Sequence, residues 1–242
     1  MKFKMVPETL YLTVDLIDRF LEKKQVRRSK LQLVGVAALL VILQDGLLCS
    51  FREVYHSLKN HRLTFIPPPS TNYSHFFLQL AAKYEEIYPP VLRELVYITD
   101  RAYVTQEILE MESEIAIALD YNLTVPTTHS FLCRYLKAAH ADRTMVQLAC
   151  YLAERTLQEY DMIRFLPSTI AATAVYIARK SLKRHAWSPT LVKYTNYDEA
   201  DMLVCAESME AFVNNTSTGQ QAVVRKYSSP KFGGVAKMTM AF

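Results

Sequence analysis

Glycine is scarce in this sequence. Only 5 of its 242 residues are glycine, whereas average usage would give roughly 17. Tight turns and phosphate-binding loops depend on the conformational freedom of glycine, so β-sandwiches, β-barrels and glycine-rich nucleotide loops are disfavoured. Half of the residues are hydrophobic, which excludes a largely disordered chain. The composition therefore favours a globular all-α protein of one large or two modest domains.

Cysteine is also sparse, and its spacing does not indicate a metal site. The four cysteines form no Cys-x-x-Cys pair, and we find no histidine at metal-ligand spacing from them. We therefore expect reduced thiols, no metal and no cofactor. The residues from Met1 to Lys4 lack the features of a signal peptide, which predicts a protein of the nucleus and cytoplasm.

No membrane or nucleic-acid partner is expected. The longest apolar run, from Leu33 to Leu43, is shorter than the roughly 20 residues that span a bilayer. The net charge is only +4, and the one dense basic cluster lies between Lys23 and Lys30. We interpret that cluster as a solvated loop at a helix end, because nucleic-acid-binding proteins usually gather basic charge over a whole face.

Apolar periodicity predicts helices throughout the first half. Leu10, Val14, Ile17 and Leu21 recur at helical spacing after Pro7. Ser29 is then predicted to cap a second helix over residues 31–40, which is apolar nearly all round and so reads as a central, surrounded helix. Two further helices are predicted over residues 91–99 and 105–119.

The same order of helices recurs in the second half. An extended linker is predicted from Leu123 to Pro126, because the residue before proline avoids helical angles. Helices are predicted around 131–136, 145–160, 167–180, 190–194 and 198–213, and the tail from Asn214 is predicted to be irregular. In each half an amphipathic helix precedes an alanine-rich apolar one, which predicts two similar bundles, over residues 1–123 and 124–242.

One carboxylate stands in an unexpected place. Ile108, Ile115 and Leu119 form the apolar stripe of the helix predicted from Thr105, and Glu112 projects from the middle of that stripe. A carboxylate there must be paired or must lie where the stripe meets a partner. A helix end that rolls outward is the simpler alternative. Lys83, which also follows an apolar helical run, is a plausible companion.

Several motifs together resemble the cyclin box of A- and B-type mitotic cyclins. The resemblance covers nearly the whole chain and leans towards the B type, and it is carried by residues 18–21, 31–38, 82–90, 97–100, 111–112 and 227–232. It implies two tandem five-helix bundles and no enzymatic activity. It also implies a regulatory subunit that binds and activates a cyclin-dependent protein kinase to control G2/M progression. The positions that match the family's kinase contacts are Lys83, Glu112, Tyr84, Ala116, Tyr121 and Leu123.

The resemblance implies a second binding surface as well. Mitotic cyclins have a shallow groove that docks Arg-x-Leu motifs of substrates and inhibitors. The matching positions are Arg28, Leu31, Gln32, Ile98 and Asp100, and Asp100 could pair with the arginine of the ligand. An ordinary core position is the alternative interpretation for Leu31 and Ile98.

The chain departs from the family pattern in two ways. No counterpart of the first box's opening helix is found, so the first bundle is expected to lack one helix and the groove to be weakened. Residues 41–79 also have no counterpart, and removing them joins Leu40 to Leu80 in the family's uninterrupted central helix. We interpret this 39-residue segment as a translated intron, with a genuine loop as the alternative, and we expect the helix to break near Gln44 and resume near Phe76.

Other functions compete with that of a kinase regulator. A cyclin-fold transcription adaptor would need a basic face, for which residues 179–185 offer a small candidate. A non-functional, mis-spliced cyclin fragment is a third possibility. No Ser/His/Asp arrangement, metal set or phosphate loop is recognised, so an enzyme is not expected.

Overall fold

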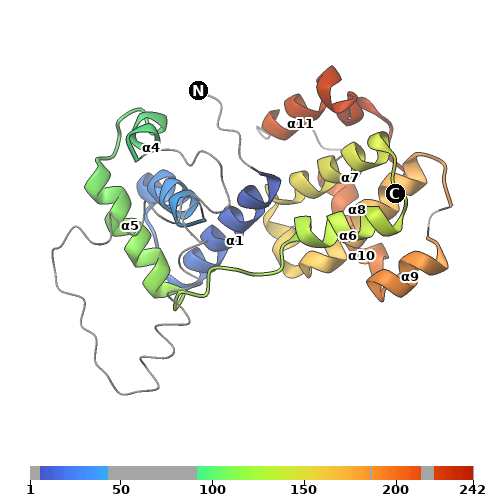
Figure 1. Ribbon diagram of the computed structural model, residues 1–242, viewed down its shortest axis with the longest axis horizontal. Coiled ribbons are helices and arrows are strands. Elements are labelled where there is room, and N and C mark those ends of the chain that lie inside the picture. Colours follow the sequence, from blue (N-terminus) through green and yellow to red (C-terminus); the bar gives the residue numbers. More distant parts are fainter. Residues whose placement is uncertain (1–5, 43–91, 186, 214–220, 242) are drawn as a thin grey trace, which may run out of the picture. The chain divides into compact units, whose positions relative to one another are not determined.

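The predicted all-α fold is confirmed. The computed structural model describes residues 6–42, 92–185, 187–213 and 221–241, and these contain helices and 3-10 turns but no β-strand. The chain divides into two compact units, one up to Val125 and one from Pro126 onward. Figure 1 shows the helices of both units. The described helices include none that is long and apolar enough to cross a membrane.

The first unit begins with α1 (Pro7–Lys23), which has proline at its first position, where the missing N–H costs nothing. The face predicted from Leu10, Val14, Ile17 and Leu21 is only partly correct, because Leu10 is exposed and the other three are half-buried. The fully buried face is offset by one residue and includes Leu16 and Phe20. The apolar residues of α1 therefore cover more of its surface than a single stripe.

The second helix spans residues 31–42 and is the centre of this unit's core. Val34, Ala37 and Ala38 are fully buried, as expected for a helix surrounded by others. Ser29 does not cap this helix, contrary to the prediction. It lies in the 3-10 turn η1 (Arg28–Lys30), and its carbonyl oxygen accepts a 2.7 Å hydrogen bond from the Tyr103 hydroxyl.

The last helices of the first unit are α4 (Leu92–Ile98) and α5 (Thr105–Ala118). At the start of α5 the Glu107 carboxylate accepts a hydrogen bond from the Val104 N–H, which satisfies an unpaired donor of the first turn. Ile108, Ile115 and Leu119 are almost fully buried, so the predicted stripe is confirmed.

The second unit is built around α8 (Pro167–Ser181), whose residues from Ile170 to Ala178 are all buried. Its alanines let neighbouring helices approach closely. It packs against α6 (Thr128–Ala138), α7 (Arg143–Thr156) and α10 (Glu199–Val213) (Figure 1). The predicted helices of this unit are confirmed, and α9 (Pro189–Thr195) follows α8.

Side-chain caps fix where several of these helices begin. Thr127 accepts a hydrogen bond from the Ser130 N–H at the start of α6, Asp142 accepts one from Met145 at the start of α7, and Ser188 accepts one from Leu191 at the start of α9. Such caps typically stabilise a helix by about 1 kcal/mol each.

The described part of the tail, residues 221–241, is more ordered than predicted. It contains α11 (Gln221–Tyr227) and the 3-10 turns η3 (Pro230–Phe232) and η4 (Val235–Lys237). Tyr227 and Val235 are buried. The Glu154 carboxylate on α7 accepts hydrogen bonds from Lys226 Nζ at 2.6 and 2.8 Å and from the Tyr227 hydroxyl at 2.6 Å. Polar composition suggested an irregular tail, but a few buried contacts with α7 order it.

Candidate protein-binding surfaces

Glu112 lies on α5 in a largely apolar environment. Its side chain is half-buried, and burial raises the pKa of its carboxyl to about 7. Among the described residues, none donates a hydrogen bond or forms an ion pair with it. Within the described residues the carboxylate form is therefore disfavoured, and a donor or a positive charge, from the predicted companion Lys83 or from a partner, would stabilise it. This half-burial agrees with the predicted place of Glu112 within the apolar stripe.

Ala116 shares the face of Glu112, one turn further along α5, and is 7% exposed. This face also includes the half-buried Leu109, one turn before Glu112. Ile117, to which the sequence did not point, is 62% exposed and lies on the solvent side of α5, about 100° around the helix from Ala116. In the sequence, only the position of Ile117 outside the buried stripe indicates that it is exposed. The resulting surface combines small and aliphatic side chains with one poorly solvated carboxylate.

The chain after α5 forms a tight turn. Asp120 and Tyr121 have φ values of 51° and 55°, a left-handed conformation that costs a non-glycine residue about 1 kcal/mol or more. Tyr121 is half-buried, whereas Leu123 is 1% exposed and belongs to the core. In this conformation Leu123 supports the surface from beneath instead of facing a partner.

Arg19 holds this turn in place from α1. Its guanidinium donates to the carbonyl oxygens of Asn122 at 2.7 Å and Leu123 at 3.5 Å, and it pairs with Asp15 at 2.7 Å. The neighbouring Asp18 is half-buried. Burial and the nearby Asp15 raise the pKa of its carboxyl. Lys83 and Tyr84, the other two predicted kinase-contact residues, lie outside the described residues.

The residues predicted for the Arg-x-Leu groove all lie on the surface of the first unit. Arg28, Gln32 and Asp100 are exposed, and Leu31 and Ile98 are 42% and 45% exposed. The alternative that Leu31 and Ile98 are ordinary core residues is therefore wrong. Their exposure leaves apolar area available to a ligand.

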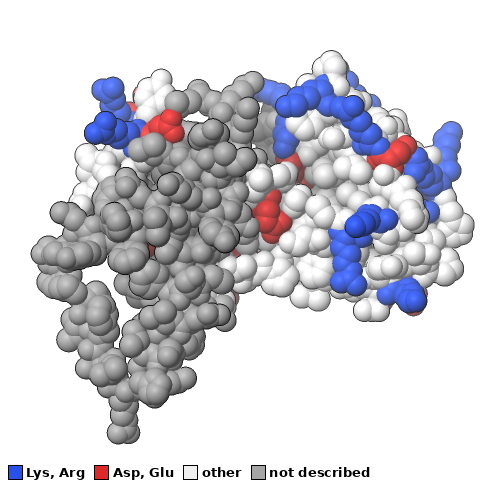
Figure 2. All heavy atoms as spheres, viewed as in Figure 1, with Lys and Arg blue, Asp and Glu red and all other residues white. Residues whose placement is uncertain are grey.

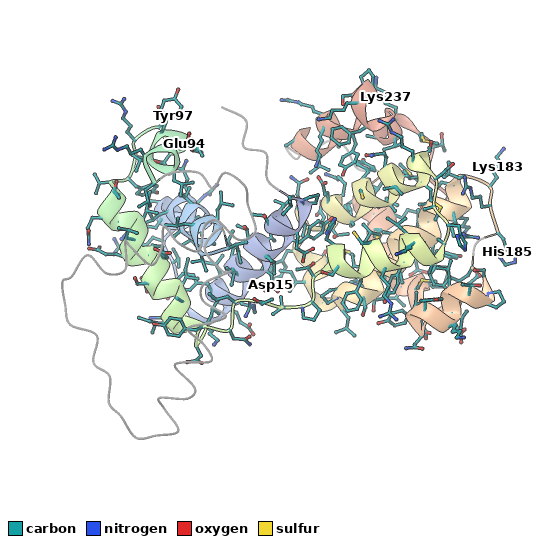
Figure 3. All side chains as sticks on the ribbon, viewed as in Figure 1. Asp15, Glu94, Tyr97, Lys183, His185 and Lys237 are labelled. Carbon is teal, nitrogen blue, oxygen red and sulfur yellow. The ribbon has the colours of Figure 1, made fainter. Side chains whose placement is uncertain are left out.

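Two segments carry these groove residues, and one hydrogen bond joins them. The Tyr103 hydroxyl donates to the carbonyl oxygen of Ser29. Ser29 is a near neighbour in sequence of Arg28, Leu31 and Gln32. Tyr103 follows Ile98 and Asp100 in the chain. Tyr97, which was not singled out from the sequence, is 67% exposed and projects from the same end of α4 (Figure 3).

The candidate basic face of the second unit is partly occupied by internal contacts. Arg179 Nε donates to the carbonyl oxygen of His185 at 2.8 Å, and Arg184 pairs with Asp142 at 2.6 Å. Lys183 and His185 remain on an exposed loop (Figure 3). Figure 2 shows lysine and arginine side chains in several separate groups on this unit. On the face in view, this arrangement differs from the continuous basic surface that a nucleic-acid-binding protein presents.

The described residues contain no group of three or more histidine, cysteine, aspartate or glutamate side chains that could hold a metal ion. One pairing was not expected from the sequence: Cys133 lies on the same face of α6 as His129, and its sulfur is 3.6 Å from Nε2 of that ring. Cys150 and Cys205 are more buried, and desolvation raises the pKa of both thiols to about 11.

Comparisons with known proteins agree on one family. The family described as cyclin, C-terminal domain, matches residues 126–241, and the family described as cyclin, N-terminal domain, matches residues 1–42 and 77–124. The unmatched stretch, 43–76, falls within the predicted insert. Val41 and Ile42, the first two residues of the predicted insert, are buried in helix 31–42 and fall within the matched residues. The expected breaks near Gln44 and Phe76 lie outside the described residues.

Relatives and one solved structure fit the same assignment. The chain is 39% identical to cyclin-B2-1 of Arabidopsis thaliana over 99% of its length and 47% of the relative's. It is 41% identical to G2/mitotic-specific cyclin-1 of Medicago sativa subsp. varia over 98% of its length and 46% of the relative's. It therefore spans about half the length of these relatives.

The fold also resembles that of a viral cyclin from herpesvirus saimiri. The TM-score is 0.61 at 16% identity, covering 85% of this chain and 75% of the viral one. At that identity the likeness concerns the fold alone. This likeness agrees with the two matched cyclin domains, one in each unit. The chain belongs to the cyclin family.

Proposed function

We propose that this member of the cyclin family is a regulatory subunit that binds and activates a cyclin-dependent protein kinase. The similarity to mitotic cyclins of the B and A types supports a role in G2/M progression, and we propose that it acts in the nucleus and cytoplasm. The chain would supply no reacting group of its own. Its contribution is to fix the position of an element of the kinase.

The observation that carries this proposal is the environment of Glu112. A half-buried carboxylate whose pKa is about 7 is costly to keep ionised, and natural surfaces keep such groups where a partner satisfies them. The exposed Ile117, on the solvent side of the same helix, adds apolar area that a partner could bury. The two side chains lie about 140° apart around α5, so a partner that contacts both must extend around the solvent side of the helix.

The activation mechanism follows from what a kinase requires. A protein kinase is active only when a glutamate of its C helix pairs with the lysine that holds the nucleotide phosphates. A rigid helical surface that binds the outer side of that C helix keeps it inward and shifts the population to the active state. In this chain α5, the Arg19-anchored turn after it and Lys83 would form that surface.

A capture experiment tests the proposal. A version of the chain without residues 41–79 is mixed with a purified mitotic cyclin-dependent kinase, and the bound kinase is measured. Replacing both Lys83 and Glu112 with alanine should abolish capture. Glu110→Ala is the matched control, since Glu110 is an exposed carboxylate on the same helix, and it should bind normally. Unchanged capture by the Lys83/Glu112 variant would refute this interface.

A second pair of variants separates the apolar contact from the charged one. Ile117→Ser should weaken kinase capture by about tenfold, because an exposed anchor residue is lost from the contact. Val104→Ser changes a side chain of similar exposure, 60%, at the other end of α5, and it should have little effect. Equal effects of the two variants would mean that capture does not use this face.

We also propose that the first unit docks Arg-x-Leu motifs. Leu31 and Ile98 would contact the leucine of the motif and Asp100 its arginine. Their exposure leaves them available for such contacts. A labelled Arg-x-Leu peptide should bind the chain, and Asp100→Asn should weaken binding while an Arg-to-Lys exchange in the peptide weakens it less. Binding that ignores Asp100 would refute this assignment.

A further inference from the structure

The second unit exposes an unusual number of large apolar side chains at one place. Ile163 and Leu166 are 55% and 64% exposed, and Leu203 and Val204 are 48% and 60% exposed. The first two belong to the segment of η2 (Tyr160–Arg164) and the loop after it, and the other two belong to α10. Tyr160 is 86% exposed at the start of η2. We call these five residues the α10–η2 patch.

A chain of hydrogen bonds joins the two halves of the patch. Arg164 Nη2 donates to the Ser208 hydroxyl at 2.8 Å, and that hydroxyl donates to the carbonyl oxygen of Val204 at 2.9 Å. Ile163 directly precedes Arg164. The elements also pack against each other, so the apolar side chains of η2 and α10 lie in one neighbourhood on a fixed scaffold.

These exposed side chains are distinct from the face of α10 that packs into the core of the unit. A separate face of α10 is already buried, through Met202, Cys205, Ala206 and Met209. Leu203 and Val204 are therefore additional apolar residues, on a part of the helix that the fold does not use. Single exposed apolar residues are common, but a cluster on two adjoining elements is typical of an interaction surface.

The charge around the patch contrasts with the rest of the unit. Residues 126–242 contain 14 lysines and arginines and 9 aspartates and glutamates. The elements α10 and η2 hold five of these nine acidic residues but only one of the basic ones, Arg164. That guanidinium is engaged with Ser208 and with the Phe165 ring at 4.8 Å. Glu207 and Glu210 are exposed on α10, at helical spacing from Leu203.

We propose that the α10–η2 patch docks a cationic protein segment that carries aliphatic anchors flanked by lysine or arginine. The apolar cluster would bury the anchors, and the carboxylates of α10 would pair with the flanking cations and select against acidic segments. The patch lies in the second unit, whereas every residue proposed for kinase contact lies in the first. This interaction is therefore separate from the proposed kinase regulation and can fail or succeed independently.

The experiment uses the full chain and defined peptides. The probe is a fluorescein-labelled amphipathic peptide with leucines on one helical face and lysines beside them, and binding is followed by fluorescence anisotropy. Two matched peptides replace every lysine with glutamate or every leucine with serine. The leucine–lysine peptide should bind at least about tenfold more tightly than either of them, and its affinity should fall with added salt.

Variants locate the binding. Ile163→Ser with Val204→Ser should weaken the leucine–lysine peptide by about tenfold or more. Val104→Ser, which changes an equally exposed valine in the first unit, should leave the affinity unchanged. Glu207→Lys with Glu210→Lys should weaken the lysine peptide and strengthen the glutamate peptide.

Three results would overturn the proposal. The first is peptide binding that survives the Ile163/Val204 substitutions or is lost equally in Val104→Ser. The second is equal binding of the lysine and glutamate peptides. The third is self-association of the chain, seen in sedimentation velocity and removed by the Ile163/Val204 substitutions, which would make the patch a contact between copies.

Discussion

The Tyr103 hydroxyl donates a 2.7 Å hydrogen bond to the carbonyl oxygen of Ser29, a residue 74 positions earlier in the chain. This bond connects η1 to the loop after α4. It thereby holds the two segments that carry Arg28, Leu31, Ile98 and Asp100 in a fixed relationship. A shallow docking surface depends on such fixed spacing, because a ligand that must first order the surface loses affinity.

Tyr103→Phe is expected to weaken Arg-x-Leu docking while leaving the fold intact. Loss of one partly exposed hydrogen bond should lower the stability of the chain by about 1 kcal/mol. The affinity for an Arg-x-Leu peptide, measured by isothermal titration calorimetry, should fall several-fold. Capture of the kinase through α5 should not change. Normal peptide affinity in this variant would show that the bond does not organise the groove.

The raised pKa of Glu112 predicts that the stability of the chain decreases as the pH rises. Its pKa of about 7 in the folded chain exceeds the ordinary value of 4.5, so between these values the folded state holds a proton that the unfolded state has lost. Stability should therefore decrease as the pH rises from about 4.5 to 7 and level off above that. Glu112→Gln should be more stable than the wild type at pH 8, by up to about 3 kcal/mol.

The check for this prediction is urea unfolding followed by circular dichroism at pH 5 and pH 8. The difference between the two proteins should be much smaller at pH 5 than at pH 8, because most of the loss of stability accumulates between pH 5 and pH 7, where folded Glu112 keeps its proton and unfolded Glu112 does not. Glu110→Gln is the control and should show no such difference. A wild-type-like pH profile in Glu112→Gln would mean that another group causes the dependence.

Kinase binding should release protons if Glu112 receives a hydrogen-bond donor in the complex. Such a donor favours the carboxylate and lowers its pKa. Near pH 7 the binding enthalpy should then depend on the ionisation enthalpy of the buffer, and the affinity should rise as the pH increases from 6 to 8. Calorimetry in phosphate and Tris buffers measures this, and Glu112→Gln should remove the effect.

The contact between Glu154 and Lys226 should couple the tail to α7. Lys226→Met leaves the Glu154 carboxylate, which is 8% exposed, bonded to the Tyr227 hydroxyl but without its lysine. We expect this substitution to lower the free energy of unfolding by about 2 kcal/mol. Adding Glu154→Gln should recover part of that loss, because no buried charge then remains. Trp187 is the only tryptophan and lies in this unit, so its fluorescence reports the urea unfolding. Additive losses in the double variant would show that the two side chains are not coupled.

The origin of the insert can be tested at the level of the transcript. If residues 41–79 are translated intron, most messages should lack that segment and join codon 40 to codon 80. Sequencing transcripts across this interval measures the fraction. A majority that retains the segment would instead identify it as a genuine loop.

Several features of this protein follow from local sequence. Ile108, Ile115 and Leu119 recur at helical spacing, and burial of that stripe required only the periodicity that an α-helix imposes. The break at Pro126 and the caps at Thr127, Asp142 and Ser188 are likewise local. Glu112 could be recognised as unusual because a carboxylate within an apolar stripe conflicts with the pattern around it.

Other features depended on contacts between distant residues. The buried face of α1 differs from the predicted one because neighbouring helices, not the spacing of leucines alone, decide which side is covered. Residues 221–241 look polar, yet Glu154 on α7 orders them through Lys226 and Tyr227. The exposure of Ile163 and Val204 cannot be read from an apolar sequence either. Sequence determines which side chains are apolar or charged, and only tertiary packing decides which of them remain on the surface to meet a partner.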